Sequence, residues 1–256
     1  MFTYCPPKPL QDLKSTTFPD GKRYYSLPDG TRLPSVTTVL GAQKKEAIKA
    51  WRKRVGEEVA NKISKKATGR GTNVHTLCER YLNNQGTGDM MPDAKEMFVA
   101  LKPELNRINN IHYQEQALWS TQLGMAGRVD CIAEFDGELA SIDFKTSAKT
   151  KSRENILDYF WQTTAYALMY EELIGTPINK LVVIMAVEDN PPLIFIEKTE
   201  DHIDGLVEAI KFSCKPVSLA KSDLTLLGWE NQRDRDFSAP FRPGGGLGDR
   251  RRDLRA

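Results

Sequence analysis

Apolar and polar positions along the chain follow helical spacing in its first half and strand-like spacing after about residue 110. Between about Lys44 and Ala67, apolar residues recur every three or four positions, which predicts one amphipathic helix with basic residues on its other faces. Its inward stripe is expected to consist of Ile48, Trp51, Val55, Val59 and Ile63. Residues 68–71 (TGRG) are expected to end this helix, and Thr72 to cap a second one that runs to about Asn83.

Runs rich in β-branched, aromatic and alternating residues predict the strands. We expect strands at Tyr113–Ser120, Gly127–Phe135, Glu138–Thr146, Lys180–Val187 and Leu193–Glu197. Residues 22–36 are expected to form a further hairpin around Pro28-Asp29-Gly30, and helices are expected over residues 93–108, 154–172 and 201–212. This order of elements predicts an α/β fold with a mixed sheet flanked by helices, preceded by an N-terminal helical segment.

The 256 residues are enough for one domain with a full core. We expect residues 1–231 to form it, with the hairpin and basic helices over 22–110 and the αβ core over 111–215, and residues 232–256 to be a disordered basic tail. The longest strongly apolar run, Leu181–Val187, is far shorter than the roughly 20 residues of a membrane span. Neither a signal nor a transit peptide is recognisable. These features predict a cytoplasmic protein that does not enter a membrane.

Charge is distributed unevenly although the total is close to neutral. Lys and Arg number 36 against 34 Asp and Glu, yet residues 43–70 are strongly basic, and a second basic cluster covers residues 145–153. Two such clusters favour a polyanionic partner, with a solvated helix face as the alternative for the first. Four widely separated cysteines and three histidines make a zinc site difficult to assemble, so carboxylates that hold Mg²⁺ or Mn²⁺ are the expected metal chemistry.

The segment from Gly127 to Ser147 is the most informative part of the chain. Asp136-Gly137 is a strong signal for a two-residue hairpin turn. The register that this turn sets places Asp130 opposite Asp143, and Arg128 opposite Lys145, on one face of the sheet. Two opposed carboxylates repel unless a positive charge lies between them, and a divalent cation would supply it. A surface salt-bridge cluster of the same four residues is the alternative, and it needs no metal.

The order Asp130, Asp143-Phe144-Lys145 and Gln162-Thr-Thr-Ala-Tyr166 resembles the PD-(D/E)XK nuclease superfamily with its restriction-endonuclease-like core. The similarity extends to the RecB-like branch, and within it to the mitochondrial genome maintenance exonuclease family and its phage relatives. Leu33–Thr37 and Gly71–Glu79 resemble further motifs of that family in the same order, so the resemblance covers roughly residues 30–212. Each motif is weak by itself, but four in order are fairly specific.

The resemblance implies a role for each matched residue. Asp130, Asp143, His75 and the carbonyl of Phe144 would hold one or two Mg²⁺ or Mn²⁺ ions, and Lys145 would be the catalytic lysine. Gln162 and Tyr166 would position the DNA strand, and we expect Lys53, Arg128, Lys149 and Lys151 to bind DNA as well. Without the resemblance, Tyr166 would be assigned to the core, Gln162 to a buried amide and His75 to a structural role. Some relatives carry four cysteines around an iron–sulfur cluster, and this chain lacks that spacing.

These residues predict a metal-dependent exonuclease that hydrolyses phosphodiester bonds and prefers single-stranded DNA ends, in phage-like replication, recombination or repair. Two other functions remain open: a structure-specific endonuclease, which includes a recombination subunit with a partner, and a nucleic-acid-binding protein that has lost its chemistry. We expect a monomer, with replication or recombination proteins as further partners.

Overall fold

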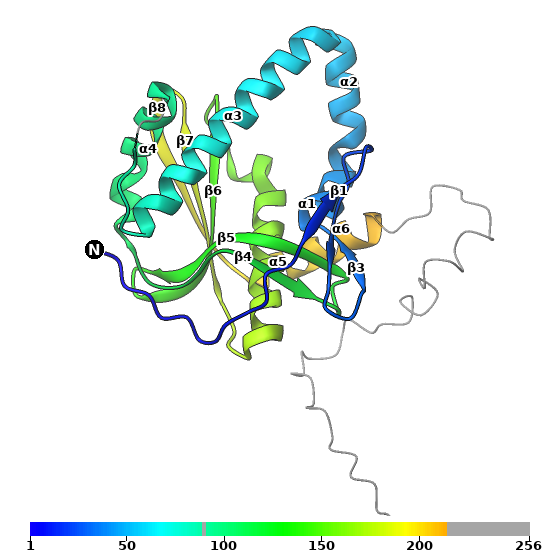
Figure 1. The fold of residues 1–256 in the computed structure, drawn as a ribbon. Coiled ribbons are helices and arrows are strands. Elements are labelled where there is room, and N and C mark those ends of the chain that lie inside the picture. The colour runs from blue at the N-terminus through cyan, green and yellow to red at the C-terminus, as the bar shows by residue number, and fades with distance from the viewer. Residues whose placement is uncertain (89–90, 214–256) are drawn as a thin grey trace, which may run out of the picture. The chain divides into compact units, whose positions relative to one another are not determined.

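A mixed sheet of five strands lies at the centre of the structure, a computed structural model that describes residues 1–88 and 91–213 (Figure 1). Its strands, in spatial order, are β4 (Ile108–Ser120), β5 (Met125–Phe135), β6 (Glu138–Ser147), β7 (Lys180–Val187) and β8 (Asn190–Lys198). Neighbouring strands are antiparallel except for β6 and β7, which are parallel because a helix connects them. The predicted mixed α/β sheet is confirmed, with somewhat longer strands.

Helices cover both faces of this sheet (Figure 1). Helices α3 (Glu57–Leu82) and α4 (Pro92–Leu105) pack on one face, where Leu77 and Phe98 meet Ile142 in the core. On the other face lie α1 (Val36–Gly41), α5 (Leu157–Ile174) and α6 (Ile203–Ser213). Three short 3₁₀ turns, η1 (Ala42–Lys44), η2 (Arg153–Ile156) and η3 (Glu200–His202), precede helices. The two cores hold the strands that carry the candidate site.

A small antiparallel sheet precedes α1. It comprises β1 (Ser15–Thr17), β2 (Arg23–Ser26) and β3 (Arg32–Pro34). The hairpin of β2 and β3 is the predicted one, with Ser26 paired to Arg32 across the turn, whereas β1 was not predicted. A bridge between Ser35 and Ala126 joins the end of this sheet to β5. The N-terminal segment is thereby placed beside the central sheet.

The basic helical region differs from its prediction. The single helix expected over residues 44–67 is divided into α2 (Lys45–Val55) and α3 at Gly56, whose φ of +86° is incompatible with a continuous helix. The predicted end at residues 68–71 is also wrong, because α3 continues through both glycines to Leu82. Gly71 lies against β6, where an added Cβ would be 3.7 Å from the Thr146 hydroxyl. That distance is an ordinary van der Waals contact, so the position does not itself require glycine. Burial of Val74, Leu77 and Cys78 in the following turns outweighs the low helix propensity of the two glycines.

The expected inward stripe of this region is not part of a core. Ile48, Val59 and Ile63 are 50%, 49% and 48% exposed, and α2 contains no buried residue. Figure 1 shows α2 and the start of α3 rising away from the central sheet. We call residues 45–66 the helical hairpin. Ile48, Val59 and Ile63 face solvent there, whereas Trp51 and Val55 are half-buried and Ala60 is buried, and the helical periodicity alone could not reveal this difference.

The predicted tail over residues 232–256, and the predicted domain end at residue 231, lie outside the described residues. Across residues 1–88 and 91–213, no helix combines the length and the apolar character that crossing a membrane requires.

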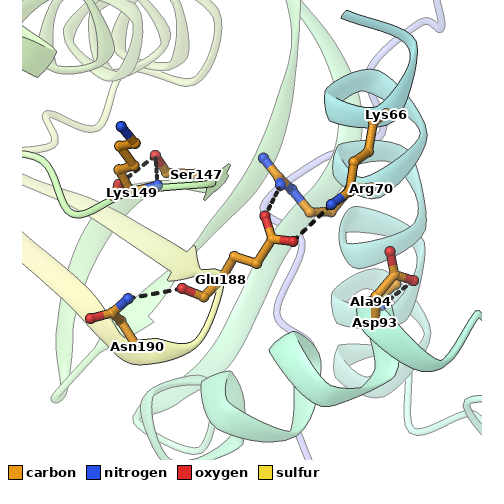
Figure 2. A network of polar contacts seen from close by, with 8 residues as sticks. All are labelled: Lys66, Arg70, Asp93, Ala94, Ser147, Lys149, Glu188 and Asn190. Atoms are coloured by element: carbon orange, nitrogen blue, oxygen red, sulfur yellow. Dashed lines mark hydrogen bonds and ion pairs between the residues drawn. The ribbon is translucent and has the colours of Figure 1, made fainter. Parts of the chain in front are cut away.

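One ion-pair network fastens α3 to the ends of β6 and β7 (Figure 2). Glu188, which follows β7, accepts hydrogen bonds at 2.9 Å from both Lys66 and Arg70 of α3. The backbone N–H of Glu188 donates to the carbonyl of Ser147 at the end of β6. The Arg70 side chain is only 6% exposed, so its charge depends on this carboxylate. The network fixes the register of α3 against the strand that carries Asp143.

Glu188→Gln should lower the free energy of unfolding by about 1–3 kcal/mol, because it leaves the buried Arg70 guanidinium without a counter-charge. Glu58→Gln is the matched control, since its pair with Lys62 is fully exposed to solvent and contributes roughly 0–0.5 kcal/mol. Urea unfolding of the three proteins measures the difference. Equal midpoints for both variants would show that the network does not hold α3.

Candidate active site

The hairpin of β5 and β6 begins as predicted. Asp136 and Gly137 both have positive φ, at +53° and +78°, as a type I′ turn requires. From this turn the two strands pair as far as Cys131 and Ile142. Beyond that point the ladder between them ends, while β5 continues to pair with β4 and β6 with β7. The two strands therefore separate, and we call the place where β5 before Cys131 and β6 after Ile142 no longer pair the fork.

The predicted direct pairings of Asp130 with Asp143 and of Arg128 with Lys145 fall within this fork, and neither forms. The carboxylate of Asp130 accepts a 2.8 Å hydrogen bond from the backbone N–H of Phe144 instead. A side chain thus takes the place of a strand-to-strand bond, and the acids stay on neighbouring strands without being directly opposed.

Asp143 is the most buried acid of the site, at 1% exposure. Its Oδ1 accepts a 3.0 Å hydrogen bond from Gln162 Nε2 of α5, and its Oδ2 forms an ion pair with Lys145. Burial raises the pKa of Asp143 to about 6, and Asp130 adds to the increase while Lys145 opposes it. For Lys145, burial lowers the pKa, but the attraction of Asp143 and Asp130 exceeds this effect and the net shift is upward. Lys145 is therefore an ammonium donor in this state.

His75 reaches the same fork from α3. Its Nδ1 lies 3.5 Å from Asp130 Oδ2, and its side chain is 30% exposed. The ring also meets Phe144 edge to face, at 6.3 Å between centroids. His75 thus presents a nitrogen beside the carboxylate of Asp130.

Glu115 is a site residue that sequence reasoning missed. The β4 residues on either side of it, Gln114 and Gln116, pair with Cys131 and Val129, so Glu115 lies opposite Asp130. Burial, followed by repulsion from Asp130, raises the pKa of Glu115 to about 7. The directly opposed carboxylates are therefore Glu115 and Asp130, and not the predicted pair of Asp130 and Asp143. The register of β4 against β5, set by the connection at residues 121–124, is the signal that would have found Glu115.

His75, Glu115, Asp130, Lys145 and Gln162 line one cavity of about 400 Å³. Two further charged residues that were not predicted as site residues also line it, Glu79 from α3 and Arg23 from β2. The complete lining is Arg23, Tyr25, Ser35, Val36, Thr37, Thr72, His75, Thr76, Glu79, Glu115, Gly127, Arg128, Asp130, Lys145, Gln162 and Tyr166. The cavity thus takes its wall from the N-terminal sheet as well as from the central one.

Tyr166 reaches the cavity because position 127 is glycine. A Cβ on Gly127 would lie 2.7 Å from the Tyr166 hydroxyl oxygen, closer than Cβ atoms approach in proteins, and 3.1 Å from Val36 Cγ2, which is a tight contact. Tyr166 is 3% exposed, and burial raises the pKa of its hydroxyl well above the usual value. Gly127 therefore allows α5, α1 and β5 to meet at the cavity wall.

The predicted DNA-binding residues are not all together. Gln162, Tyr166 and Arg128 line the cavity, where Arg128 also forms a 2.5 Å ion pair with Asp12 and donates to the carbonyl of Glu115. Lys149 and Lys151 lie on the loop after β6, and Lys53 lies on α2; none of these three lines the cavity.

The donors of the fork match a hard divalent cation. His75, Glu115 and Asp130 each offer one ligand atom, and these atoms all lie within 4.8 Å of one another. Asp143 adds a further carboxylate on the neighbouring strand. Oxygen ligands with one imidazole suit Mg²⁺ or Mn²⁺. Burial is the main cause of the raised pKa values of Glu115 and Asp143, and a bound cation would favour the charged form of both carboxylates.

Comparison with known proteins agrees with this geometry. The model of the PD-(D/E)XK nuclease superfamily matches residues 90–216, the stretch that contains the fork and α5. The chain carries a PD-(D/E)XK nuclease domain. Its mixed five-stranded sheet flanked by helices is the fold that the sequence resemblance implied. The helical hairpin, His75 and the N-terminal sheet lie outside the matched stretch.

Three relatives of this nuclease domain share the name mitochondrial genome maintenance exonuclease 1. The Mus musculus protein is 25% identical over 194 residues, which cover 72% of this chain and 57% of the relative. The Homo sapiens protein is 25% identical over 174 residues (62% and 51%), and the Xenopus tropicalis protein 24% over 209 residues (72% and 60%). The chain thus spans about half to three fifths of the length of these relatives. A crystal structure of a putative exonuclease from Eubacterium rectale has 11% identity and a TM-score of 0.41, and the match covers 57% of this chain and 63% of that one.

Glu115→Gln should stabilise the metal-free protein at neutral and higher pH. The folded-state pKa of Glu115, about 7, lies above its ordinary value of 4.5, so its contribution to stability is complete below pH 4.5 and is lost as the pH rises through 7. In EDTA at pH 8 we expect the variant to exceed wild type by roughly 2 kcal/mol, and the difference to vanish near pH 4.5.

Denaturant unfolding between pH 4.5 and 8 measures this difference, and Glu46→Gln on the exposed face of α2 is the control. Added magnesium should stabilise wild type more than Glu115→Gln, because the variant lacks one carboxylate ligand. A pH-independent difference would rule out a raised pKa, and equal gains with magnesium would exclude Glu115 as a ligand.

Proposed function

We propose that this nuclease domain is a metal-dependent deoxyribonuclease that degrades single-stranded DNA from its ends, in replication, recombination or repair as in phage relatives. The observation that carries this proposal is the meeting of four groups at one fork: His75, Asp130 and Lys145 line the cavity, and Asp143 lies buried behind it in an ion pair with Lys145. The exonuclease names of the relatives support the choice of reaction. A monomer in the cytoplasm of a bacterium or phage-infected host stays a prediction.

Asp130, Asp143, Glu115, His75 and the carbonyl of Phe144 are the groups that would hold Mg²⁺ or Mn²⁺. When bound, the cation would supply Lewis-acid polarisation of the phosphate and lower the pKa of a water molecule. The protein itself supplies the carboxylate cluster that would bind the cation.

Lys145 would act on the phosphate as a positive charge. Because the carboxylates keep it protonated, its ammonium can donate to a phosphate oxygen or to the attacking water and stabilise charge that develops in the transition state. Gln162 holds Asp143 by its 3.0 Å hydrogen bond and so orients the carboxylate toward Lys145. Tyr166 and Arg128 line the wall on which the substrate strand would lie.

The helical hairpin supports a preference for single strands. It carries exposed lysines, among them Lys49 and Lys53, together with the half-exposed side chains of Ile48, Val59 and Ile63. Phosphates of a single strand would pair with the lysines while its unstacked bases cover apolar side chains that duplex DNA would leave in water. A purely basic surface would not distinguish the two forms.

Linear and circular single-stranded DNA, incubated with magnesium, manganese or EDTA, test the proposed reaction. We expect the linear substrate to disappear only with metal and the circle to survive. Asp143→Asn should slow the reaction at least about 100-fold, and Lys145→Ala by a similar factor, because each removes a group acting on the phosphate. Asp204→Asn on the exposed surface of α6 is the matched control.

Cleavage of circles would replace the exonuclease with an endonuclease. Binding without cleavage under every metal condition would indicate a nucleic-acid-binding protein without nuclease activity. Full activity of Lys145→Ala would refute the proposed role of Lys145 in cleavage.

The double variant Lys49→Ala/Lys53→Ala should raise KM for single-stranded DNA several-fold with little change in kcat. The reason is that the helical hairpin would bind the DNA strand away from the reacting phosphate. Loss of two phosphate contacts should also reduce the salt dependence of binding, by roughly 1.4 in the slope of log K against log salt. Lys95→Ala/Lys211→Ala, on α4 and α6, is the charge-matched control. A fall in kcat with KM unchanged would place the lysines in chemistry and not in binding.

A further inference from the structure

The ring of Tyr159, in the first turn of α5, lies near two lysine ammonium groups. Lys145 Nζ is 5.0 Å from the ring centroid, and Lys44 Nζ is 5.5 Å from it. Both distances are within the roughly 6 Å over which an aromatic face attracts a cation. Tyr159 is not part of the cavity lining, and the proposed reaction gives it no role.

Each of these ammonium groups also has a carboxylate partner. Lys145 pairs with Asp143, and Lys44 pairs with Asp158, the residue before Tyr159, at 2.6 Å. Lys44 ends η1 directly before the helical hairpin. The ring therefore lies between two ion pairs, one at the cavity and one at the base of the helical hairpin.

A lysine ammonium ends a flexible four-carbon chain, so a single ion pair leaves it several orientations. The face of an aromatic ring attracts it without accepting a conventional hydrogen bond. The ring can thus restrict Lys145 Nζ while its N–H donors stay available for Asp143 and for a phosphate or water. A second carboxylate in that place would occupy a donor and add to the acid repulsion already present at the fork.

We propose that Tyr159 is a positioning residue, whose ring face holds the Lys145 ammonium at the edge of the cavity where the phosphate reacts. This inference rests on the proposed function, because it requires Lys145 to act in cleavage. It assigns the effect to the π face of the ring and not to the phenolic hydroxyl.

The test replaces Tyr159 by Leu, by Phe and by Phe carrying one, two or three ring fluorines, in the full-length protein. Tyr159→Leu should lower kcat by about 3- to 30-fold with KM nearly constant, the range that corresponds to one cation–π contact. Tyr159→Phe should keep most of the activity. Each added fluorine withdraws charge from the ring face at nearly constant size, so kcat should fall stepwise along the series.

Phe98 offers a matched control, because its ring lies 5.3 Å from Lys102 Nζ on α4 and neither residue lines the cavity. The same fluorinated series at Phe98 should leave kcat unchanged. A constant kcat along the Tyr159 series would overturn the inference and show that the ring contributes only packing. Loss of activity in Tyr159→Phe as large as in Tyr159→Leu would overturn it in favour of the hydroxyl.

Lys145→Ala distinguishes this inference from the function on which it rests. If that variant is inactive while kcat stays constant along the Tyr159 series, the proposed role of Lys145 stands and the positioning role of Tyr159 fails. If Lys145→Ala cleaves at the wild-type rate, the proposed role of the lysine itself fails.

Discussion

The hydrogen bond from the Phe144 N–H to the Asp130 carboxylate is the interaction on which the rest of the site depends. A backbone N–H that leaves a ladder must find another acceptor, and a buried one without a partner would be costly. Here a carboxylate fills that place, so β5 and β6 can separate without an unpaired group. The separation of the strands opens the cavity, and the hydrogen bond from Phe144 holds the Asp130 carboxylate beside it. The same bond thus makes room for a substrate and places a ligand beside it.

Crowding of acids is the second consequence of the fork. Glu115 lies opposite Asp130, and Asp143 is buried on the next strand, where Lys145 is its ion-pair partner. Burial, and then repulsion from Asp130, raise the pKa of both Glu115 and Asp143. Apolar residues in these places would stabilise the fold better than a cluster of buried acids. The acid cluster therefore offers a candidate site for a divalent cation.

Local signals in the sequence predicted the five strands of the central sheet and part of the candidate site. The Asp136-Gly137 turn fixed the register of β5 against β6 near the turn, and the motif resemblance predicted Asp130, Asp143 and Lys145 as site residues. What local signals could not show is where a ladder ends, because that depends on the twist of the strands and on the helices packed against them. Glu115 was missed for the same reason: its role depends on pairing with β5 and not on its own neighbours in sequence. The stripe of Ile48 and Ile63 has the spacing of a buried face, and only tertiary structure shows that nothing covers it.

Residues outside the matched nuclease stretch complete the cavity. Arg23 and Thr37 come from the N-terminal sheet and α1, and His75 comes from α3, yet all three line the same space as Lys145. Their positions are fixed by separate contacts: the bridge between Ser35 and Ala126 for the N-terminal sheet, and the Glu188 network for α3. Because each contact attaches to β5, β6 or the end of β7, a shift of the fork would move wall and ligands together. The cavity wall and the candidate ligands are therefore attached to the same strands. The helical hairpin, in contrast, extends from α2 and α3 into solvent.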